Sequence, residues 1–128
     1  MYEVLSFAKE TENKFRWDCI VNKAKFQLYI PKWRVPDPIP LTIYVRLYEV
    51  ALAPPNIKTY SRQDIELKPS LRSENIFSHV KKSDDKTLTV RFDPIGNSQD
   101  WEIGNPYIPE SILPSAEIEE LIIEVQWR

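Results

Sequence analysis

The segment spanning residues 26–50 is the feature that most narrows the folds open to this chain. Residues 26–30 and 41–50 are strand-like, because apolar and more polar side chains alternate along them. A period of two is typical of strands with one buried face. Residues 31–40 between them are rich in proline, which has no backbone N–H and fixes φ, so they cannot form an inner strand. We therefore expect two core strands joined by a stiff, extended crossover.

The same alternation recurs along the rest of the chain. It predicts strands near residues 2–8, 15–21, 88–92 and 101–103, and a turn at Asn22-Lys23. Residues 117–127 fit a helical stripe as well as a strand, and the run Ile122-Ile123 favours the strand. About seven short strands with proline-rich connections predict an all-β fold, an antiparallel β-sandwich, with a partly open β-barrel as the alternative.

The middle of the chain has weaker patterns. Residues 57–71 alternate faintly, which predicts at most one short edge strand. Residues 73–82 are the place for the one short helix that the sequence allows. Ser73 is a suitable N-cap there, and Ile76 and Val80 are four positions apart.

A faint repeat relates the two halves of the chain. Residues 29–31, Tyr-Ile-Pro, recur as residues 107–109, seventy-eight positions later, and Val35-Pro36 is matched by Leu113-Pro114. The match indicates either a pseudo-twofold fold or a coincidence in a chain with eleven prolines. Phe26, which falls opposite Gly104, weakens the first interpretation. Under either one, each Tyr-Ile-Pro segment is expected to end a strand and to deliver the chain to a core strand.

Length and composition limit the class of protein. A chain of 128 residues predicts one β domain over residues 1–128. The formal net charge of −2 gives no general attraction to nucleic acid or anionic membranes, so nucleic acid is a disfavoured partner. No apolar run is long enough to span a membrane, and the N-terminus lacks a signal-peptide pattern. With a single cysteine, these features predict a cytoplasmic protein without a membrane partner.

Few residues suit catalysis, and no catalytic residue, metal site or cofactor is predicted. His79 is the only histidine, and Cys19 lies on the apolar row of its strand. Two glycines cannot build a phosphate-binding loop. Carboxylates do cluster, and an enzyme using them alone requires two to meet in one cleft. The candidates for that alternative are Asp93, Asp100, Glu102 and Glu49.

One short segment suits binding. Trp33 lies between Lys32 and Arg34, and prolines hold both flanks, so an exposed indole there would be a stiff stacking surface. In the alternative interpretation Trp33 plugs the core and the two cations stay in solvent. The candidate site consists of Lys32, Trp33, Arg34, Tyr29, Tyr44, Arg46 and Tyr48.

These observations favour a non-catalytic module that binds another protein or a second copy of itself. The alternative is a binder of a small ligand, a sugar or single-stranded nucleic acid through Trp33. The enzyme that uses carboxylates alone is the third hypothesis.

Overall fold

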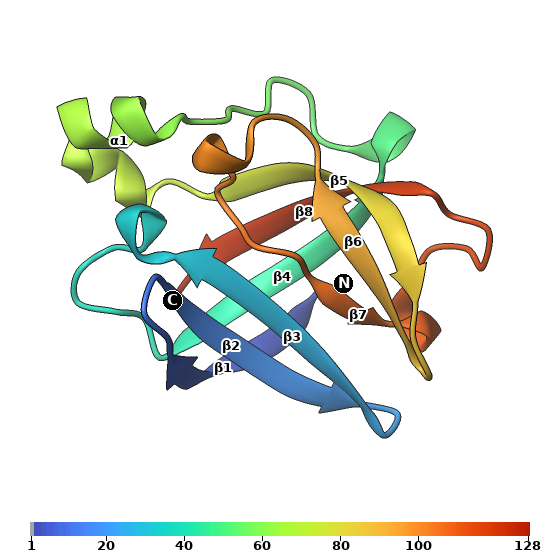
Figure 1. Ribbon diagram of the computed structural model, residues 1–128. Helices are drawn as coiled ribbons and strands as arrows, with labels where there is room; N and C mark the ends of the chain where they lie inside the picture. Colours follow the sequence, from blue (N-terminus) through green and yellow to red (C-terminus); the bar gives the residue numbers. More distant parts are fainter. Residues whose placement is uncertain (1) are drawn as a thin grey trace.

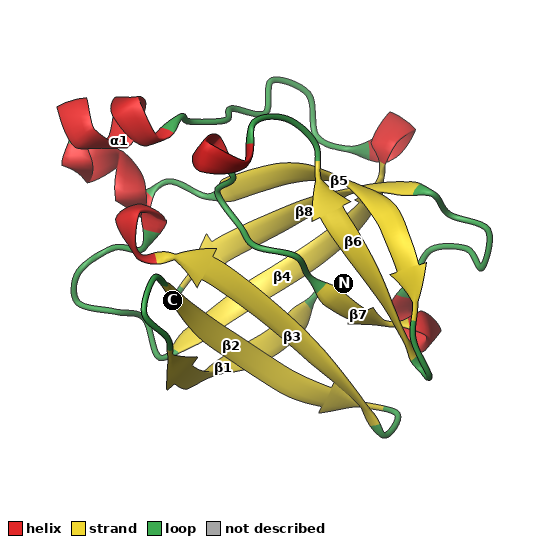
Figure 2. Cartoon of the chain, in the orientation of Figure 1, coloured by secondary structure: helices red, strands yellow, loops and turns green. Residues whose placement is uncertain are grey.

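A computed structural model describes residues 2–128 as a closed, eight-stranded antiparallel β-barrel (Figures 1 and 2). The strands are β1 (Glu3–Glu10), β2 (Lys14–Val21), β3 (Ala24–Pro31), β4 (Thr42–Glu49), β5 (Ile76–Asp85), β6 (Thr89–Pro94), β7 (Tyr107–Pro109) and β8 (Glu120–Trp127). The helix is α1 (Arg62–Leu67), and the 3₁₀ turns are η1 (Lys32–Arg34), η2 (Val50–Leu52), η3 (Pro69–Ser73), η4 (Ser98–Asp100) and η5 (Glu110–Ile112). No helix within residues 2–128 is long and apolar enough to cross a membrane.

The prediction of an all-β fold is confirmed, but the prediction of a sandwich is wrong. Strand β1 pairs with β2 on one side and with β4 on the other, so the sheet closes on itself. The inner side chains form one core cluster that includes Trp17, Leu28, Val45 and Phe92. Alternation is the same in a sandwich and a barrel, so it could not reveal this closure.

The predictions for the middle of the chain are also wrong. Residues 76–85 form strand β5, which pairs with β6 and β8, so the expected helix at 73–82 is absent from the described residues. The helix lies instead at α1, where the expected edge strand would have been. Ser61 accepts a hydrogen bond from the Asp64 backbone, and the Asp64 side chain accepts one from the Ser61 backbone, which closes a capping box. Residues 101–103 are irregular, whereas the C-terminal strand is confirmed as β8.

The barrel has the pseudo-twofold order that the repeat suggested. Three strands, a 3₁₀ turn and a fourth strand (β1–β2–β3–η1–β4) have counterparts in the second half (β5–β6–β7–η5–β8). The second half has the additional turn η4 between β6 and β7, and η2, α1 and η3 lie between the halves. Around the barrel the order is β1-β2-β3-β7-β6-β5-β8-β4, and exchanging the two series leaves it unchanged. Registers agree as well: Phe7 opposite Trp17 is matched by Lys82 opposite Phe92. Each Tyr-Ile-Pro segment ends a strand, as predicted, but then enters a 3₁₀ turn where an extended crossover was expected after the first of them. Because β3 and β7 are antiparallel, η1 and η5 lie at opposite ends of the barrel.

The turn between β2 and β3 offers a test of local backbone strain. Asn22 and Lys23 both have left-handed backbones, with φ of 48° and 68°. Two-residue turns of this kind favour Asn-Gly, because a side chain at the second position crowds the following carbonyl. We expect Lys23→Gly to raise the free energy of unfolding by about 0.5–1 kcal/mol in urea titrations. Lys25→Gly, inside β3, should lower it by a similar amount. A loss of stability in Lys23→Gly would contradict the turn geometry.

Candidate functional site

A cavity lined by two tryptophans lies at one end of the barrel. It encloses about 390 Å³ where the β1–β2 hairpin, η1 and the loop between β6 and β7 meet. Trp33 and Trp101 line it together with the cations of Lys14, Lys32 and Arg62. A second hollow of about 380 Å³ shares Lys14 and Gly104 with the first. The two hollows together are named the tryptophan groove. The second hollow adds Thr11, Gln27, Tyr29, Asn105 and Tyr107.

Short backbone contacts hold the floor of the tryptophan groove. The Gly104 N–H donates to the Tyr29 carbonyl at 2.7 Å, and the Lys32 N–H donates to the Asn13 carbonyl at 3.0 Å. A Cβ at position 104 would lie 3.1 Å from the Tyr29 Cβ and 3.3 Å from the Lys14 Cε. Glycine therefore suits this close approach of the β6–β7 loop to β3, where any side chain would press on Tyr29 and Lys14.

Trp33 differs from the other three tryptophans. The indole N–H groups of Trp17, Trp101 and Trp127 each donate to a backbone carbonyl. The Trp33 indole has no such acceptor within residues 2–128, and its side chain is half-buried. Trp33 therefore does not plug the core, and its N–H and part of its ring are free for a ligand.

The charges around the tryptophan groove nearly balance. Lys32 pairs with Glu10 at 2.6 Å, and Arg62 pairs with Glu66 at 3.3 Å. The remaining lining cation, Lys14, is offset by the carboxylate of Glu12 on the same cavity. The groove is thus polar and aromatic without being strongly cationic.

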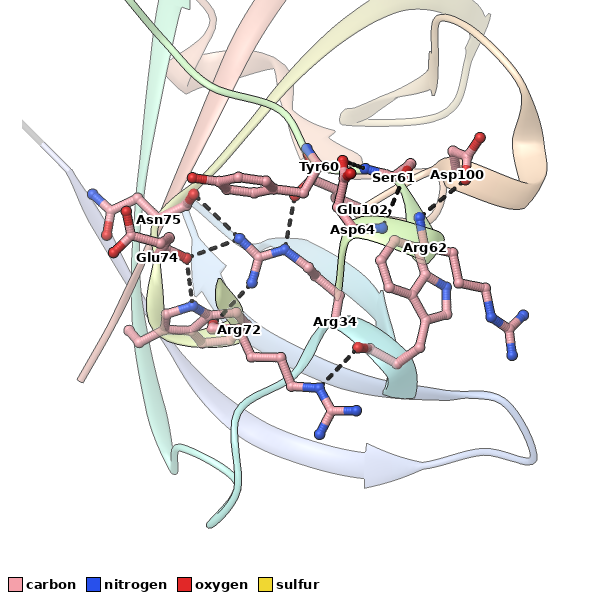
Figure 3. A network of polar contacts seen from close by, with 12 residues as sticks. Arg34, Tyr60, Ser61, Arg62, Asp64, Arg72, Glu74, Asn75, Asp100 and Glu102 are labelled. Carbon is pink, nitrogen blue, oxygen red and sulfur yellow. Dashed lines mark hydrogen bonds and ion pairs between the residues drawn. The ribbon is translucent and has the colours of Figure 1, made fainter. Parts of the chain in front are cut away.

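Arg34 is fully buried and cannot touch a ligand in this fold. Its Nε donates to Glu102 at 2.7 Å, and its terminal nitrogens donate to the carbonyls of Arg72 at 2.8 Å and Glu74 at 2.9 Å (Figure 3). Its guanidinium also lies 5.8 Å from the centre of the Tyr60 ring. Arg34 is a structural residue that ties the segment carrying α1 and η3 to the end of the barrel.

The carboxylates that an enzyme would need already accept hydrogen bonds from other groups of the protein. Asp100 and Glu102 line one hollow of about 280 Å³. Asp100 accepts the Arg62 backbone N–H at 3.0 Å, and Glu102 accepts from both Arg34 and the Tyr60 backbone. Burial raises the pKa of Glu102, although its hydrogen bonds act in the opposite direction. Both carboxylates of this hollow are thus hydrogen-bonded within the protein, and Glu102 is also the partner of Arg34.

The other two candidate carboxylates are Asp93 and Glu49. Asp93 accepts from Asn105 at 2.7 Å and Arg91 at 3.3 Å, and Glu49 is exposed at the end of β4. Within residues 2–128, no three His, Cys, Asp or Glu side chains lie close enough together to hold a metal.

The remaining predicted residues lie on another surface, over β4. The rings of Tyr2 and Tyr44 are 4.6 Å apart, with Arg46 over the Tyr2 ring at 5.7 Å and Arg128 over the Tyr44 ring at 5.4 Å. Tyr48 donates to Glu124 at 2.7 Å. We name this set the tyrosine–arginine patch; it consists of Tyr2, Tyr44, Arg46, Tyr48 and Arg128. The predicted site is thus divided: Lys32, Trp33 and Tyr29 line the groove, and Tyr44, Arg46 and Tyr48 do not.

The lone histidine and the lone cysteine belong to neither the tryptophan groove nor the tyrosine–arginine patch. His79 pairs with Glu120 at 2.6 Å on the outer face of β5. Cys19 is half-buried, and burial raises the pKa of its thiol, which disfavours the nucleophilic thiolate.

Sequence reasoning missed part of the groove. Lys14, Arg62 and Trp101 were not predicted, since they come from three distant segments that only the fold brings together. Tyr107 alone had a signal, as the counterpart of Tyr29 in the repeat. Comparison of the chain with protein-family models, curated proteins and solved structures finds no match. Inference about function therefore rests on the geometry of the groove and the patch.

Proposed function

We propose that this protein is a non-catalytic binding module that holds its ligand in the tryptophan groove. The observation that carries the proposal is Trp33, whose indole lines a cavity with Trp101 and has no acceptor for its N–H among residues 2–128. Concave sites with aromatic walls and a few convergent polar groups are typical of ligand binding. The occupied state of Asp100 and Glu102 argues against catalysis in the neighbouring hollow.

The ligand that fits best is a neutral oligosaccharide. The apolar C–H face of a sugar ring packs on an aromatic side chain, and its hydroxyls bond to side-chain amides and ammonium groups. The groove offers Asn13, Gln99, Gln27 and Asn105 for those bonds. Single-stranded nucleic acid also stacks on aromatic rings, but it needs a groove with clear excess positive charge, and here the charges nearly balance.

Trp33→Ala is expected to abolish this binding. The wild-type protein is first screened against an oligosaccharide array to identify a ligand. Calorimetry then compares the affinity of the wild-type protein and of the variant for that ligand. Removing an aromatic anchor should weaken affinity at least about tenfold. The fold should survive, because the bond from Arg72 reaches the Trp33 backbone carbonyl and not its indole.

Tyr44→Ala is the matched control, because it also removes a half-buried aromatic ring but lies on the other surface. It should leave oligosaccharide affinity unchanged. The proposal would be refuted if the wild-type protein bound no oligosaccharide on the array, or if the Trp33→Ala variant bound with the affinity of wild type. Preferential binding of single-stranded oligonucleotides would identify the groove but overturn the ligand class.

A protein partner at the tyrosine–arginine patch is the second candidate. Stacked tyrosine and arginine side chains are enriched at the centres of protein interfaces. Arg46 is exposed and Arg128 adjoins it, so the partner that fits is an acidic segment of another protein. The same two variants decide this candidate: a protein captured by wild type and by Trp33→Ala, but not by Tyr44→Ala, would place the site on the patch.

A further inference from the structure

The pseudo-twofold order creates a counterpart of the tryptophan groove at the opposite end of the barrel. A pocket of about 540 Å³ lies there, where the β5–β6 hairpin, η5 and the β2–β3 turn meet. The groove is bounded by the equivalent elements of the other half, namely the β1–β2 hairpin, η1 and the β6–β7 loop. We name this counterpart the η5 pocket.

Two substitutions distinguish the η5 pocket from the groove. Lys32 of η1 is matched by Glu110 of η5, and Trp33 is matched by Ser111. Both Glu110 and Ser111 line the pocket. The indole that occupies one end of the barrel is therefore missing from the other, and the η5 pocket is larger than the cavity of about 390 Å³ that Trp33 lines.

Leu88, which lines the η5 pocket, has a left-handed backbone and a half-exposed apolar side chain. Its φ is +67°, which a leucine rarely adopts, and 53% of its surface is exposed. The left-handed backbone belongs to the β5–β6 hairpin turn, which is closed by the hydrogen bond from the Lys86 N–H to the Thr89 carbonyl, and the half-exposed Leu88 side chain adds apolar surface to the lining of the pocket. Ala24 and Val90 provide a buried apolar floor beneath it.

The charge of the η5 pocket favours a cation. Lys82 pairs with Asp85 at 3.2 Å, so these two charges offset each other. The Glu110 carboxylate has no ion-pair partner within residues 2–128 and leaves the lining with a net negative charge.

We propose that the η5 pocket binds a small aromatic amine, with the ring in the place of the missing indole and the ammonium beside Glu110. The apolar floor and Leu88 would cover the ring, and the carboxylate would select the positive charge. This site is separate from the tryptophan groove and does not depend on what the groove binds.

The test uses tryptamine and indole-3-acetate, which carry the same ring with opposite charges. In two-dimensional NMR of the 128-residue chain, millimolar tryptamine should shift the amide signals of Asn22, Leu88 and Ser111 and leave those of Trp33 and Trp101 in place. Indole-3-acetate should bind at least about tenfold more weakly, because it meets the unpaired carboxylate.

Two variants complete the test. Ser111→Trp should fill the pocket and abolish the shifts, and Glu110→Lys should reverse the preference in favour of indole-3-acetate. An absence of localised shifts, or shifts that persist in folded Ser111→Trp, would overturn the proposal. If Ser111→Trp does not fold, Glu110→Lys decides: an unchanged preference for tryptamine overturns the proposed role of the pocket.

Discussion

Leu28→Asp is expected to unfold the barrel. Leu28 is fully buried in β3, directly opposite Trp17 of β2, and belongs to the apolar core cluster of the barrel. An aspartate at this position must either remain charged in an apolar interior or bind a proton, and each choice is unfavourable. We expect a loss of more than about 4 kcal/mol, close to the total stability of many small domains.

Circular dichroism during heating and denaturant titration would measure this loss. Leu41→Asp is the control, because Leu41 is 74% exposed just before β4 and the change should stay within about 0.5 kcal/mol of wild type. A Leu28→Asp variant that melts like wild type would show that the inward row of β3 is wrongly assigned.

Arg34→Met should produce the second-largest loss, about 3–5 kcal/mol. The methionine fills part of the arginine volume, but it leaves the Glu102 carboxylate buried without its cation, and the carbonyls of Arg72 and Glu74 without their donors. Urea titration measures the loss. Hydrogen exchange should also show that α1 and η3 lose protection before the barrel strands do, since Arg34 ties that segment to the barrel.

The pH dependence of Arg34→Met provides an independent check. Without the arginine, only the hydrogen bond from the Tyr60 N–H still opposes the effect of burial on Glu102, so the pKa of Glu102 in the folded variant lies further above the usual carboxyl value. The folded variant then binds a proton more tightly than the unfolded chain, and its stability falls as pH rises through that range. The deficit relative to wild type should be smaller at acidic pH. Adding Glu102→Gln should recover part of the stability at neutral pH, and a deficit that is independent of pH would contradict this account.

Local patterns in the sequence were sufficient for the strands that carry a clean period of two. The strands predicted at residues 15–21, 26–30, 41–50 and 88–92 are present as β2, β3, β4 and β6, because burying one face requires that alternation. Leu41, Val50 and Leu88, at the ends of the predicted ranges, lie outside the strands and are exposed. Strand β5 was missed because Ile76 and Val80 lie four apart, a spacing that suits both a helix face and one face of a strand. Its pairing with β8, which no local pattern reveals, decided between them.

The candidate site shows the same division. The sequence directed attention to the segment around Trp33, since prolines on both sides limit what that segment can do, and the structure places Trp33 on the wall of a cavity. It could not show that Arg34 turns inward, because this requires Glu102, sixty-eight positions away, to meet it in the interior. Likewise, Tyr44 and Tyr48 were grouped with Trp33 because they are near it in sequence. The folded barrel places them on the tyrosine–arginine patch instead.

The sequence by itself therefore determined the all-β class and most strand positions, since each depends on residues that are neighbours along the chain. It left the repeat open, and the strand order of the barrel decided in favour of a pseudo-twofold. Only the tertiary structure decided that the sheet closes, that Arg34 is a structural ion-pair partner, and that Trp33 and Trp101 share one cavity. Those features depend on contacts between distant segments. Such contacts are selected by the packing of the whole barrel, and no local spacing encodes them.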